Sequence, residues 1–345
     1  MEKGSRKIPE ISLSHLKRLT DDTGILQHSM ILIPDRKNGY SADDNARAVI
    51  AMVKYYSIYK DAGALEMLDT YLAFIIHSQD KDGLIRNFMN YQRKWVRNEQ
   101  MSDAFGRVIW AFGSVIAQPP SKAYIVTAKE CFDKSVKHFG KQSARGTAYS
   151  ILGMDGYLKE FSDSGEIKEK IESAAEKLAD LYQGNNSSDW QWFEDTLTHD
   201  NAILPLALFT AGSILDKIYL KIAETTCRFL ISQTFNGSHF SFVGNKGWFK
   251  RGRKKAQFDQ QPIEVASTCL MLKAAFEATG NEEYRELANK AFGWFLGEND
   301  LSIPLYDSQT GGCCDGLGDG GVNENEGAES IISFLLSRLT LAEEK

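Results

Sequence analysis

The stretch that decides the fold is Asp43–Tyr59, DDNARAVIAMVKYYSIY, with the break Asp61-Ala-Gly63 and the segment Ala64–Gln79, ALEMLDTYLAFIIHSQ, directly after it. In both segments apolar residues recur every three or four positions, which is the spacing of one face of an α-helix. Because a short turn joins them, the two helices are predicted to pack antiparallel as a hairpin. A long polar loop, Asp80–Ser102, follows the second helix.

This unit recurs along the chain of 345 residues. Helices are predicted over Asp103–Ala117, Ala123–Phe139, Gly146–Phe161, Ile167–Tyr182, Asn201–Leu215, Lys217–Gln233, Pro262–Thr279, Glu282–Leu296 and Gly327–Thr340, and an N-terminal amphipathic helix over Ile11–Thr20. Long loops follow the second helix of a pair, over Gly184–Asp200, Phe235–Gln261 and Gly297–Glu326. We therefore predict an all-α fold, an (α/α)6 toroid with short β-hairpin insertions in the rim loops.

The toroid is predicted to be a single domain over residues 1–345, closed by the N-terminal helix 11–20. Its inner helices are expected to begin near Asp44, Asp103, Gly146, Asn201, Pro262 and Gly327, and they are rich in Ala and Gly, which let helices crowd around an axis. The alternative is a two-domain helical solenoid, but solenoid repeats of roughly 34 to 47 residues are shorter and more regular. The long loops are expected to gather at one rim of the ring, where a site would lie.

The composition excludes several classes of function. The 40 Lys and Arg residues against 46 Asp and Glu residues give a formal charge of -6, which offers no general attraction for nucleic acid or anionic lipid. No segment approaches the roughly 18 uninterrupted apolar residues of a membrane span. An odd number of cysteines and no secretory signal in the chain as given predict a cytoplasmic protein with buried thiols.

Four short segments carry a family resemblance. They are Gly39–Arg47 (GYSADDNAR), Ser102–Arg107 (SDAFGR), Phe258–Pro262 (FDQQP) and Asn323–Ser330 (NENEGAES). They resemble those of a bacterial (α/α)6 domain of the six-hairpin glycosidase-like superfamily, which is also found fused behind group 1 glycosyltransferases. The resemblance covers most of the chain and implies the toroid, a carbohydrate substrate and a possible separate glycosyltransferase partner.

Carboxylates stand near the starts of most predicted inner helices, and five are candidate catalytic residues: Asp43, Asp44, Asp103, Asp195 and Asp259. For any one of them, capping of the helix N-terminus is an alternative role. The ring would point them at one cavity, and glycoside hydrolysis needs two carboxyl groups on opposite sides of a sugar. Asp43 and Asp44 are the strongest candidates, because two adjacent carboxylates at one helix start cannot both be caps.

Polar and aromatic residues near these carboxylates are candidate substrate-binding residues. They are Tyr40, Asn45, Arg47, Arg107, Trp190, Trp192, His199, Asn201, Trp248, Gln260, Gln261, Glu264 and Glu329. Trp190 and Trp192 are expected either to stack on sugar rings or to plug the end of the toroid. Trp248 lies in the basic segment 246–255, which is interpreted as a solvated hairpin or, alternatively, as a flap that selects an anionic sugar.

No metal or cofactor is predicted. The segment Asp315–Glu326 imitates part of a calcium loop, but Leu317 occupies a ligand position, so we interpret the segment as a glycine-rich loop. The cysteines and histidines show no zinc spacing, and no phosphate-binding glycine loop is present.

The leading hypothesis is a glycoside hydrolase that acts on an oligosaccharide through one protonated carboxyl and one carboxylate, with inversion as the default mechanism. Which carboxylate is the acid and which the base is left open. One alternative is a non-catalytic glycan-binding or partner domain that serves a glycosyltransferase. Another is a sugar epimerase or a lyase on the same scaffold. The lack of a visible histidine pair counts against the epimerase.

Overall fold

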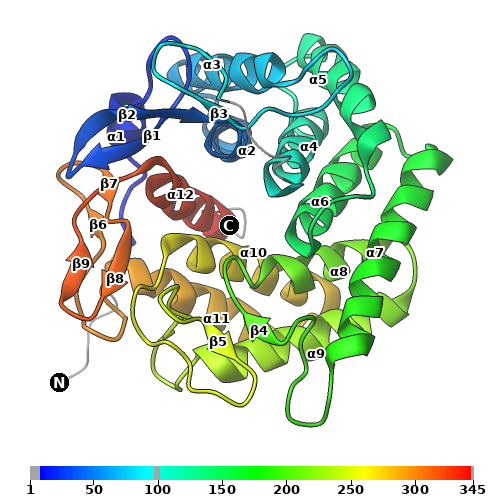
Figure 1. Ribbon diagram of the computed structural model, residues 1–345, viewed down its shortest axis with the longest axis vertical. Helices are drawn as coiled ribbons and strands as arrows, with labels where there is room; N and C mark the ends of the chain where they lie inside the picture. Colours follow the sequence, from blue (N-terminus) through cyan, green and yellow to red (C-terminus); the bar gives the residue numbers. More distant parts are fainter. Residues whose placement is uncertain (1–7, 97–101, 343–345) are drawn as a thin grey trace.

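The computed structural model describes residues 8–96 and 102–342, which form two concentric rings of helices (Figure 1). The inner ring consists of α2 (Ala42–Tyr59), α4 (Ser102–Ala117), α6 (Ala144–Glu160), α8 (Ile203–Ile214), α10 (Pro262–Thr279) and α12 (Ala328–Ala342). The outer ring consists of α1 (Ser14–Leu19), α3 (Ala62–Ser78), α5 (Lys122–Ser135), α7 (Gly165–Asn185), α9 (Lys217–Thr234) and α11 (Glu282–Gly293).

The inner ring is closed. Each inner helix packs on the next one, and α12 packs on α2, while α1 covers α12 from outside. This confirms the predicted (α/α)6 toroid and excludes an open solenoid. The N-terminal helix is shorter than predicted, since α1 spans only Ser14–Leu19. Two predicted helices end in 3-10 turns, η1 (Val136–His138) and η2 (Trp294–Leu296).

Glycines allow the closest approach in the inner ring, between α4 and α6. A Cβ atom at Gly106 would overlap the carbonyl oxygen of Gly146, and one at Gly113 would overlap that of Gly153. Only residues without a side chain permit this separation. The small residues noted in the sequence therefore have the crowding role that was predicted for them.

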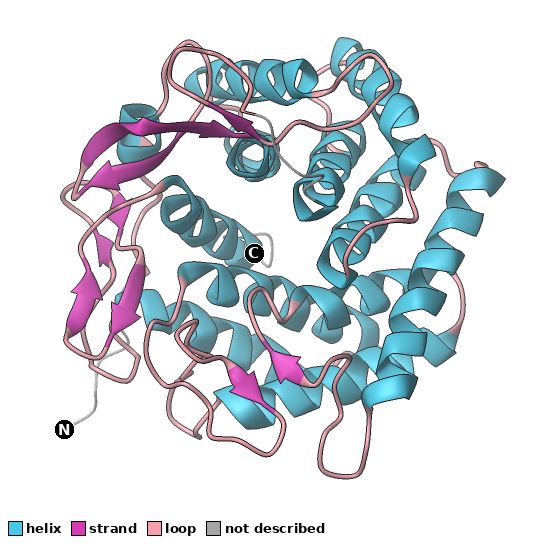
Figure 2. Ribbon diagram, in the orientation of Figure 1, coloured by secondary structure: helices cyan, strands magenta, loops and turns pink. Residues whose placement is uncertain are grey.

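Short antiparallel strands lie in the rim loops, as predicted (Figure 2). β1 (Leu26–Met30), β2 (Ile33–Ser41) and β3 (Phe88–Met89) form one sheet, in which Tyr40 lies opposite both Leu26 and Met89. The remaining pairs are β4 (Thr196–Leu197) with β5 (Phe249–Lys250), β6 (Tyr306–Asp307) with β7 (Gly312–Cys313), and β8 (Gly316–Gly318) with β9 (Gly321–Asn323). The β1–β2 hairpin is an addition to the predicted elements, none of which lies between Thr20 and Asp43.

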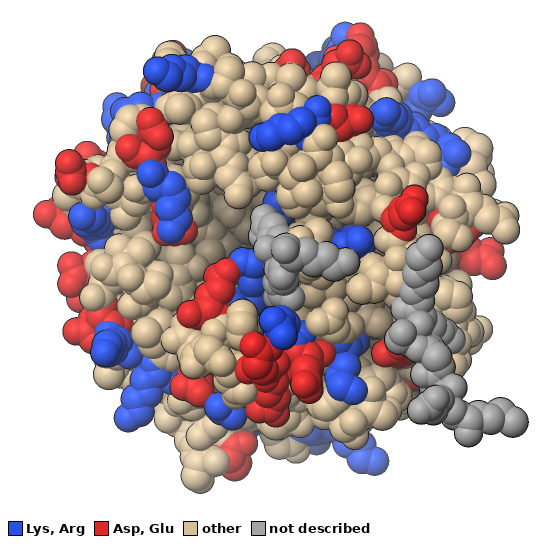
Figure 3. Space-filling model, turned by 180° about the vertical axis from the view of Figure 1, so that it is seen from behind, with Lys and Arg blue, Asp and Glu red and all other residues tan. Residues whose placement is uncertain are grey.

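On the face turned away from these loops, acidic and basic side chains are interspersed (Figure 3). In the part of the chain that the structure describes, no helix has the length and apolar character needed to cross a membrane. Four of the five cysteines are buried, Cys314 is half-buried, and all five are free thiols.

Candidate functional site

An open cavity of about 760 Å³ lies where the inner helices begin, on the side of the ring that carries the strands. This volume falls within the usual range of ligand pockets, roughly 300 to 1,000 Å³. Ten of the predicted site residues line it: Asp43, Asp44, Arg47, Asp103, Arg107, His199, Asp259, Gln260, Gln261 and Glu329. They come from α2, α4, α12 and the loops that precede α8 and α10, so residues far apart in the sequence share one cavity.

Asp43 and Asp44 enter the cavity from the first turn of α2. The cap of this helix is Ser41, whose hydroxyl accepts a hydrogen bond from the Asp44 backbone N–H at 2.9 Å. The Asp43 N–H is satisfied separately by Asn87 Oδ1 at 3.1 Å. Because other side chains cap the helix, neither aspartate carboxylate is needed for capping.

Two buried guanidinium groups bind the Asp43 carboxylate. Arg47 Nη2 lies 2.7 Å from Asp43 Oδ2, and Arg107 Nε donates to Asp43 Oδ1 at 2.6 Å. Burial alone would raise the pKa of Asp43, but the charges of Arg107 and Arg47 outweigh it, so the pKa lies below its ordinary value. Asp43 is therefore a carboxylate near neutral pH.

The pKa of Asp44 is displaced in the opposite direction. Its side chain accepts a hydrogen bond from Ser41 Oγ at 2.6 Å, and Arg47 Nη1 is more distant, at 3.6 Å. Burial is the main cause that raises the pKa of Asp44 to about 6; Arg47 opposes it and the neighbouring Asp43 adds to it. Two adjacent carboxyl groups thus have pKa values displaced in opposite directions, which is the pattern of an acid and base pair.

Arg107 lines the cavity, and Tyr149 and Asp200 contact its guanidinium group from behind the lining. The Arg107 guanidinium stacks on the ring of Tyr149, 3.9 Å from its centroid, and lies 3.5 Å from Asp200 Oδ2. The Tyr149 hydroxyl donates to the same Asp200 oxygen. Arg47 is held in a similar way, since its Nη1 also donates to Glu329 at the start of α12. Both guanidinium groups therefore have fixed positions.

Asp103 lies at the start of α4 and contacts residues of the neighbouring loops. Ser143 Oγ donates to one of its oxygens, and His199 Nε2 lies 3.5 Å from the other. Burial would raise the pKa of Asp103, but these hydrogen bonds from His199 and Ser143 lower it to about 2. Asp103 is thus a carboxylate near neutral pH in the lining of the cavity, in contact with His199.

Several predicted site residues lie outside the cavity lining. Asp195 is exposed on the rim, 3.7 Å from Lys250 Nζ. Tyr40 is buried in the sheet, and its hydroxyl donates to Asp21 at 2.6 Å. Asn45 is also buried, and its Oδ1 accepts from the Ile25 N–H.

The three tryptophans that were predicted to bind substrate do not line the cavity. Trp190 and Trp192 are buried and pack against Phe229, so they neither face the cavity nor plug it. Trp248 is half-buried, with its ring centroid 6.4 Å from that of His199 and outside the lining.

Asn201 and Glu264 lie below the cavity floor. Asn201 donates from its backbone N–H and its Nδ2 to Glu264 Oε2, at 3.3 and 3.1 Å. Burial raises the pKa of Glu264 to about 7, with a further contribution from Asp200. Glu264 Oε1 has no hydrogen-bond partner among the described residues.

The basic segment 246–255 is held by its own contacts at the rim. Arg251 donates to Ser187 and Asp189, and Lys255 Nζ donates to the Gln233 carbonyl at 3.0 Å. None of its basic side chains lines the cavity.

Sequence reasoning missed the lining residues Ser41, Gln27, His28, Asn87, Asn245, Asp315, Asn323 and Ser330. Ser41 could have been found from its pattern, since a serine three residues before an acidic residue is a helix-start signature. The others lie on strands and loops, apart from Ser330 in the first turn of α12, and no local signal marks them. Asp315 and Glu326, the two ends of the calcium-like segment, bind different partners: Asp315 accepts from Ser330 Oγ at 2.6 Å, and Glu326 lies 3.3 Å from His15. Among the described residues, no group of three or more His, Cys, Asp or Glu is arranged to hold a metal ion.

Similarity to known proteins is found at the level of structure. No family model and no curated protein matches the sequence. A sugar epimerase from a ruminal bacterium superposes with a TM-score of 0.75 at 10% identity, over 96% of this chain and 95% of that one. A D-mannose isomerase gives 0.74 at 11% identity, over 96% and 95%.

A third similar structure is an inactive variant of an α-1,6-mannanase from Salegentibacter sp. HEL1_6 in complex with α-1,6-mannotetrose, in which two consecutive aspartates are replaced by alanine. Its TM-score is 0.66 at 11% identity, over 96% of each chain. At such identities, the likeness to these proteins shows a shared fold, the (α/α)6 toroid.

Proposed function

We propose that this protein is a glycoside hydrolase that cleaves an oligosaccharide in the cavity at the centre of the ring. The observation that carries the proposal is the pair Asp43 and Asp44, two adjacent carboxyl groups in an open cavity whose pKa values are displaced in opposite directions. A hydrolase of this class needs one carboxylic acid and one carboxylate.

In the proposed reaction Asp44, in its protonated form, donates its proton to the glycosidic oxygen, and the bond between that oxygen and the anomeric carbon breaks. Asp43 stays ionised beside Arg47 and Arg107. It takes a proton from the attacking water, whose oxygen forms the new bond to the anomeric carbon. Inversion at that carbon stays a prediction.

The similar structures support a carbohydrate substrate. Three of them are described as a sugar epimerase, a mannose isomerase and a mannanase. The mannanase is inactive as a variant that lacks two consecutive aspartates. Asp43 and Asp44 are likewise consecutive.

The test is to incubate the protein with a panel of neutral oligosaccharides and to separate the products by chromatography. Asp44→Asn and Asp43→Asn are each expected to lower turnover by about 10²- to 10⁴-fold, the usual contribution of a general acid or base. Asp319→Asn is the matched control, because Asp319 is an exposed rim aspartate that does not line the cavity. Full activity of the folded Asp44→Asn variant would refute its role.

Epimerisation is the second candidate, and a specific observation favours it. His28 and His199, from β1 and from the loop before α8, both line the cavity, so two histidines are present there after all. The products distinguish the two reactions, since hydrolysis releases shorter sugars, whereas epimerisation keeps the chain length and changes one sugar residue. Loss of activity in His28→Gln and His199→Gln, with Asp44→Asn still active, would favour the epimerase.

A non-catalytic glycan-binding role has less support. That role predicts a cavity plugged by Trp190 or Trp192, and both side chains are buried elsewhere. Association with a separate glycosyltransferase stays a prediction.

A further inference from the structure

Asp259 is a cavity carboxylate with an unusual backbone conformation, and its side chain has no partner among the residues that the structure describes. Its φ is +62°, in the left-handed region that few residues other than glycine adopt. Its side chain lines the cavity and has no hydrogen bond or ion pair to any described residue. Its backbone is nevertheless fixed, because its carbonyl accepts from the Asn245 N–H at 3.0 Å. Strained residues of this kind persist where the surroundings hold them, and they cluster at ligand contacts.

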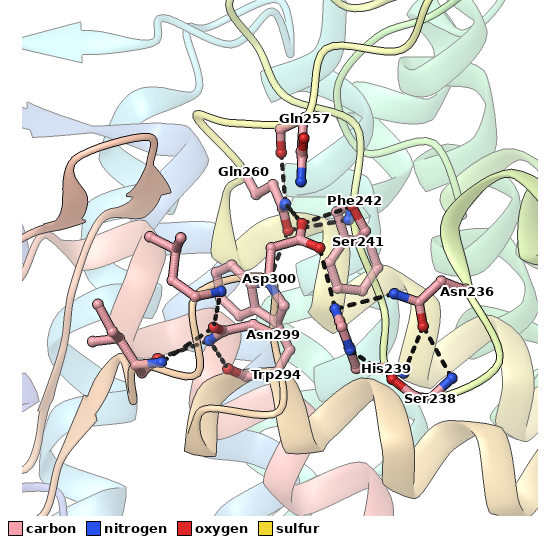
Figure 4. Close-up of polar contacts among 12 residues, drawn as sticks. Asn236, Ser238, His239, Ser241, Phe242, Gln257, Gln260, Trp294, Asn299 and Asp300 are labelled. Atoms are coloured by element: carbon pink, nitrogen blue, oxygen red, sulfur yellow. Dashed lines mark hydrogen bonds and ion pairs between the residues drawn. The ribbon is translucent and has the colours of Figure 1, made fainter.

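The next residue, Gln260, anchors this segment in the protein interior (Figure 4). Its side chain is fully buried and makes four hydrogen bonds. The amide oxygen accepts from the Phe242 N–H at 3.1 Å and from Trp294 Nε1 at 2.9 Å. The amide nitrogen donates to the Gln257 carbonyl and to Asp300 Oδ2, each at 2.6 Å. Gln260 is thus an anchor and not a sugar-binding group.

Gln260 also joins two walls of the cavity. Its backbone N–H donates to the Leu317 carbonyl at 3.1 Å, and its carbonyl accepts from the Leu317 N–H at 2.9 Å. Leu317 is the middle residue of β8, whose two glycines, Gly316 and Gly318, line the cavity. A displacement of Gln260 would therefore move both Asp259 and the β8–β9 hairpin.

Asp300 holds Gln260 from outside the cavity. Its carboxylate accepts from three side chains: Gln260, Ser241 Oγ at 2.7 Å and His239 Nε2 at 3.1 Å (Figure 4). The neighbouring Asn299 is more fully buried than Asp300 and makes four hydrogen bonds, but none of them is to Asp259 or Gln260. Asp300 and Asn299 thus form a natural pair of test and control.

The charge of the cavity indicates which sugars suit it. The lining holds the carboxylates of Asp43, Asp44, Asp103, Asp259, Asp315 and Glu329 against the guanidinium groups of Arg47 and Arg107. Both guanidinium groups already pair with Asp43. A uronic acid or a sugar phosphate would meet an excess of like charge, whereas hydroxyl groups of a neutral sugar can donate to a free carboxylate.

We propose that Asp259 binds hydroxyl groups of a neutral oligosaccharide, and that Asp300 is the positioning residue that holds Asp259 in place through Gln260. This inference rests on the proposed function for its substrate class. In Figure 1, α12 lies between α2, which carries Asp43 and Asp44, and α10, which follows Asp259, and it packs on both helices. Asp259 would therefore bind a part of the oligosaccharide away from the bond that is cleaved.

The first test measures binding by calorimetry on the Asp44→Asn background, so that no probe is consumed. The probes are α-1,6-mannotetrose and cellotetraose, with trigalacturonic acid as the anionic comparison. Adding Asp259→Asn is expected to weaken binding of the better neutral probe about 10- to 100-fold, as for loss of hydrogen bonds to a charged group. Adding Asp319→Asn, which removes the same charge from the neighbouring exposed turn, is expected to leave Kd unchanged.

Three results of this test would overturn the proposal. They are unchanged binding in the Asp259→Asn variant, an equal loss in the Asp319→Asn control, and binding of trigalacturonic acid alone or of no probe. Asp259 has no partner to lose among the described residues, so its variant is expected to fold.

The second test separates positioning from general stability. Asp300→Ala is expected to raise Kd about tenfold, because a loosely held binding group loses most of its contribution. Asp300→Asn is expected to restore binding, since its oxygen can still accept from Gln260 and Ser241. Asn299→Ala is expected to lower the melting temperature without changing Kd.

A double variant makes the positioning claim refutable. In the Asp259→Ala background, adding Asp300→Ala is expected to change Kd by less than about twofold, because the two residues act on the same contact. A full further tenfold loss would show that Asp300 does not act through Asp259. If Asp300→Ala does not fold, Asp300→Ser takes its place, because its shorter side chain cannot reach Gln260. An unchanged Kd in Asp300→Ser, or a full further tenfold loss when it is added to Asp259→Ala, overturns the proposal.

These outcomes are independent of the hydrolase proposal. Failure of the hydrolase proposal appears as an absence of cleavage that Asp43 and Asp44 control. Failure of the present inference appears as affinities that do not depend on Asp259. Binding that depends on Asp259 in a protein that cleaves nothing would support this inference and reject the hydrolase.

Discussion

Glu264, at the start of α10, provides a stability test of the electrostatics below the cavity. The residue is 4% exposed, and its Oε1 has no hydrogen-bond partner among the described residues. The neighbouring Asp200 also has one buried oxygen, Oδ1, without such a partner. Because a buried carboxylate without full pairing is costly, we expect Glu264→Gln to stabilise the folded protein wherever Glu264 would be ionised.

The size of the effect follows from the pKa of Glu264, which burial raises from an ordinary value of 4.5 to about 7. Below pH 4.5 the group is protonated in both the folded and the unfolded protein, so the substitution gains nothing. The folded protein loses stability as the pH rises from 4.5 to 7, and above pH 7 the loss is constant. A rise of this size corresponds to about 3 kcal/mol, or an increase in melting temperature of about 4 °C for a chain of this length.

The measurement is thermal unfolding of the native protein and of Glu264→Gln by calorimetry at pH 4 and pH 8. The variant is expected to be more stable at pH 8 and equal at pH 4. Glu172→Gln, on the exposed face of α7, is the control and should change neither value. A gain of equal size at both pH values, or a loss at pH 8, would refute the reasoning.

Three further predictions concern the cavity and the ring. If Asp44 is the acid, kcat/KM falls as the pH rises through about 6, because Asp44 loses its proton. Activity persists in mild acid, because the low pKa of Asp43 keeps that base ionised there. A pH–rate profile that is flat from pH 5 to pH 8 would contradict this. Arg107→Met should cost about 3 to 5 kcal/mol, because it leaves the buried carboxylate of Asp200 without a cation, and denaturant unfolding measures this loss of stability. Gly106→Ala should destabilise by about 1 to 3 kcal/mol through overlap between α4 and α6, whereas Gly165→Ala, which has open space, should not; equal melting temperatures of the two variants would argue against the packing.

The helices and their closure could be predicted from the sequence because each follows from a local pattern. Apolar spacing marked both helices of every pair, and alternating loop lengths indicated which helix of a pair faces inward. Closure then brought Asp43, Asp103 and Asp259 into one cavity, as the ring predicts. These inferences needed no knowledge of how particular side chains pack.

The aromatic and loop residues could not be placed in the same way. Trp190 and Trp192 lie in a polar loop, and only the packing of that loop on Phe229 of α9 decides that they belong to the core. His28 and Asp315 lie almost 300 positions apart in the sequence and reach the same cavity only when the ring closes. No local pattern carries such information.

The contact between Arg47 and Glu329, which joins α2 to α12, can form only late in the synthesis of the chain. Arg47 is translated early, but the glutamate that holds it, Glu329, follows 282 residues later. Until α12 has left the ribosome, α2 keeps an uncovered flank and the cavity lacks one wall. A chain cut off before Ala328 therefore lacks the inner helix that packs on both α2 and α10, and the apolar surface left uncovered makes it a target of proteases and chaperones.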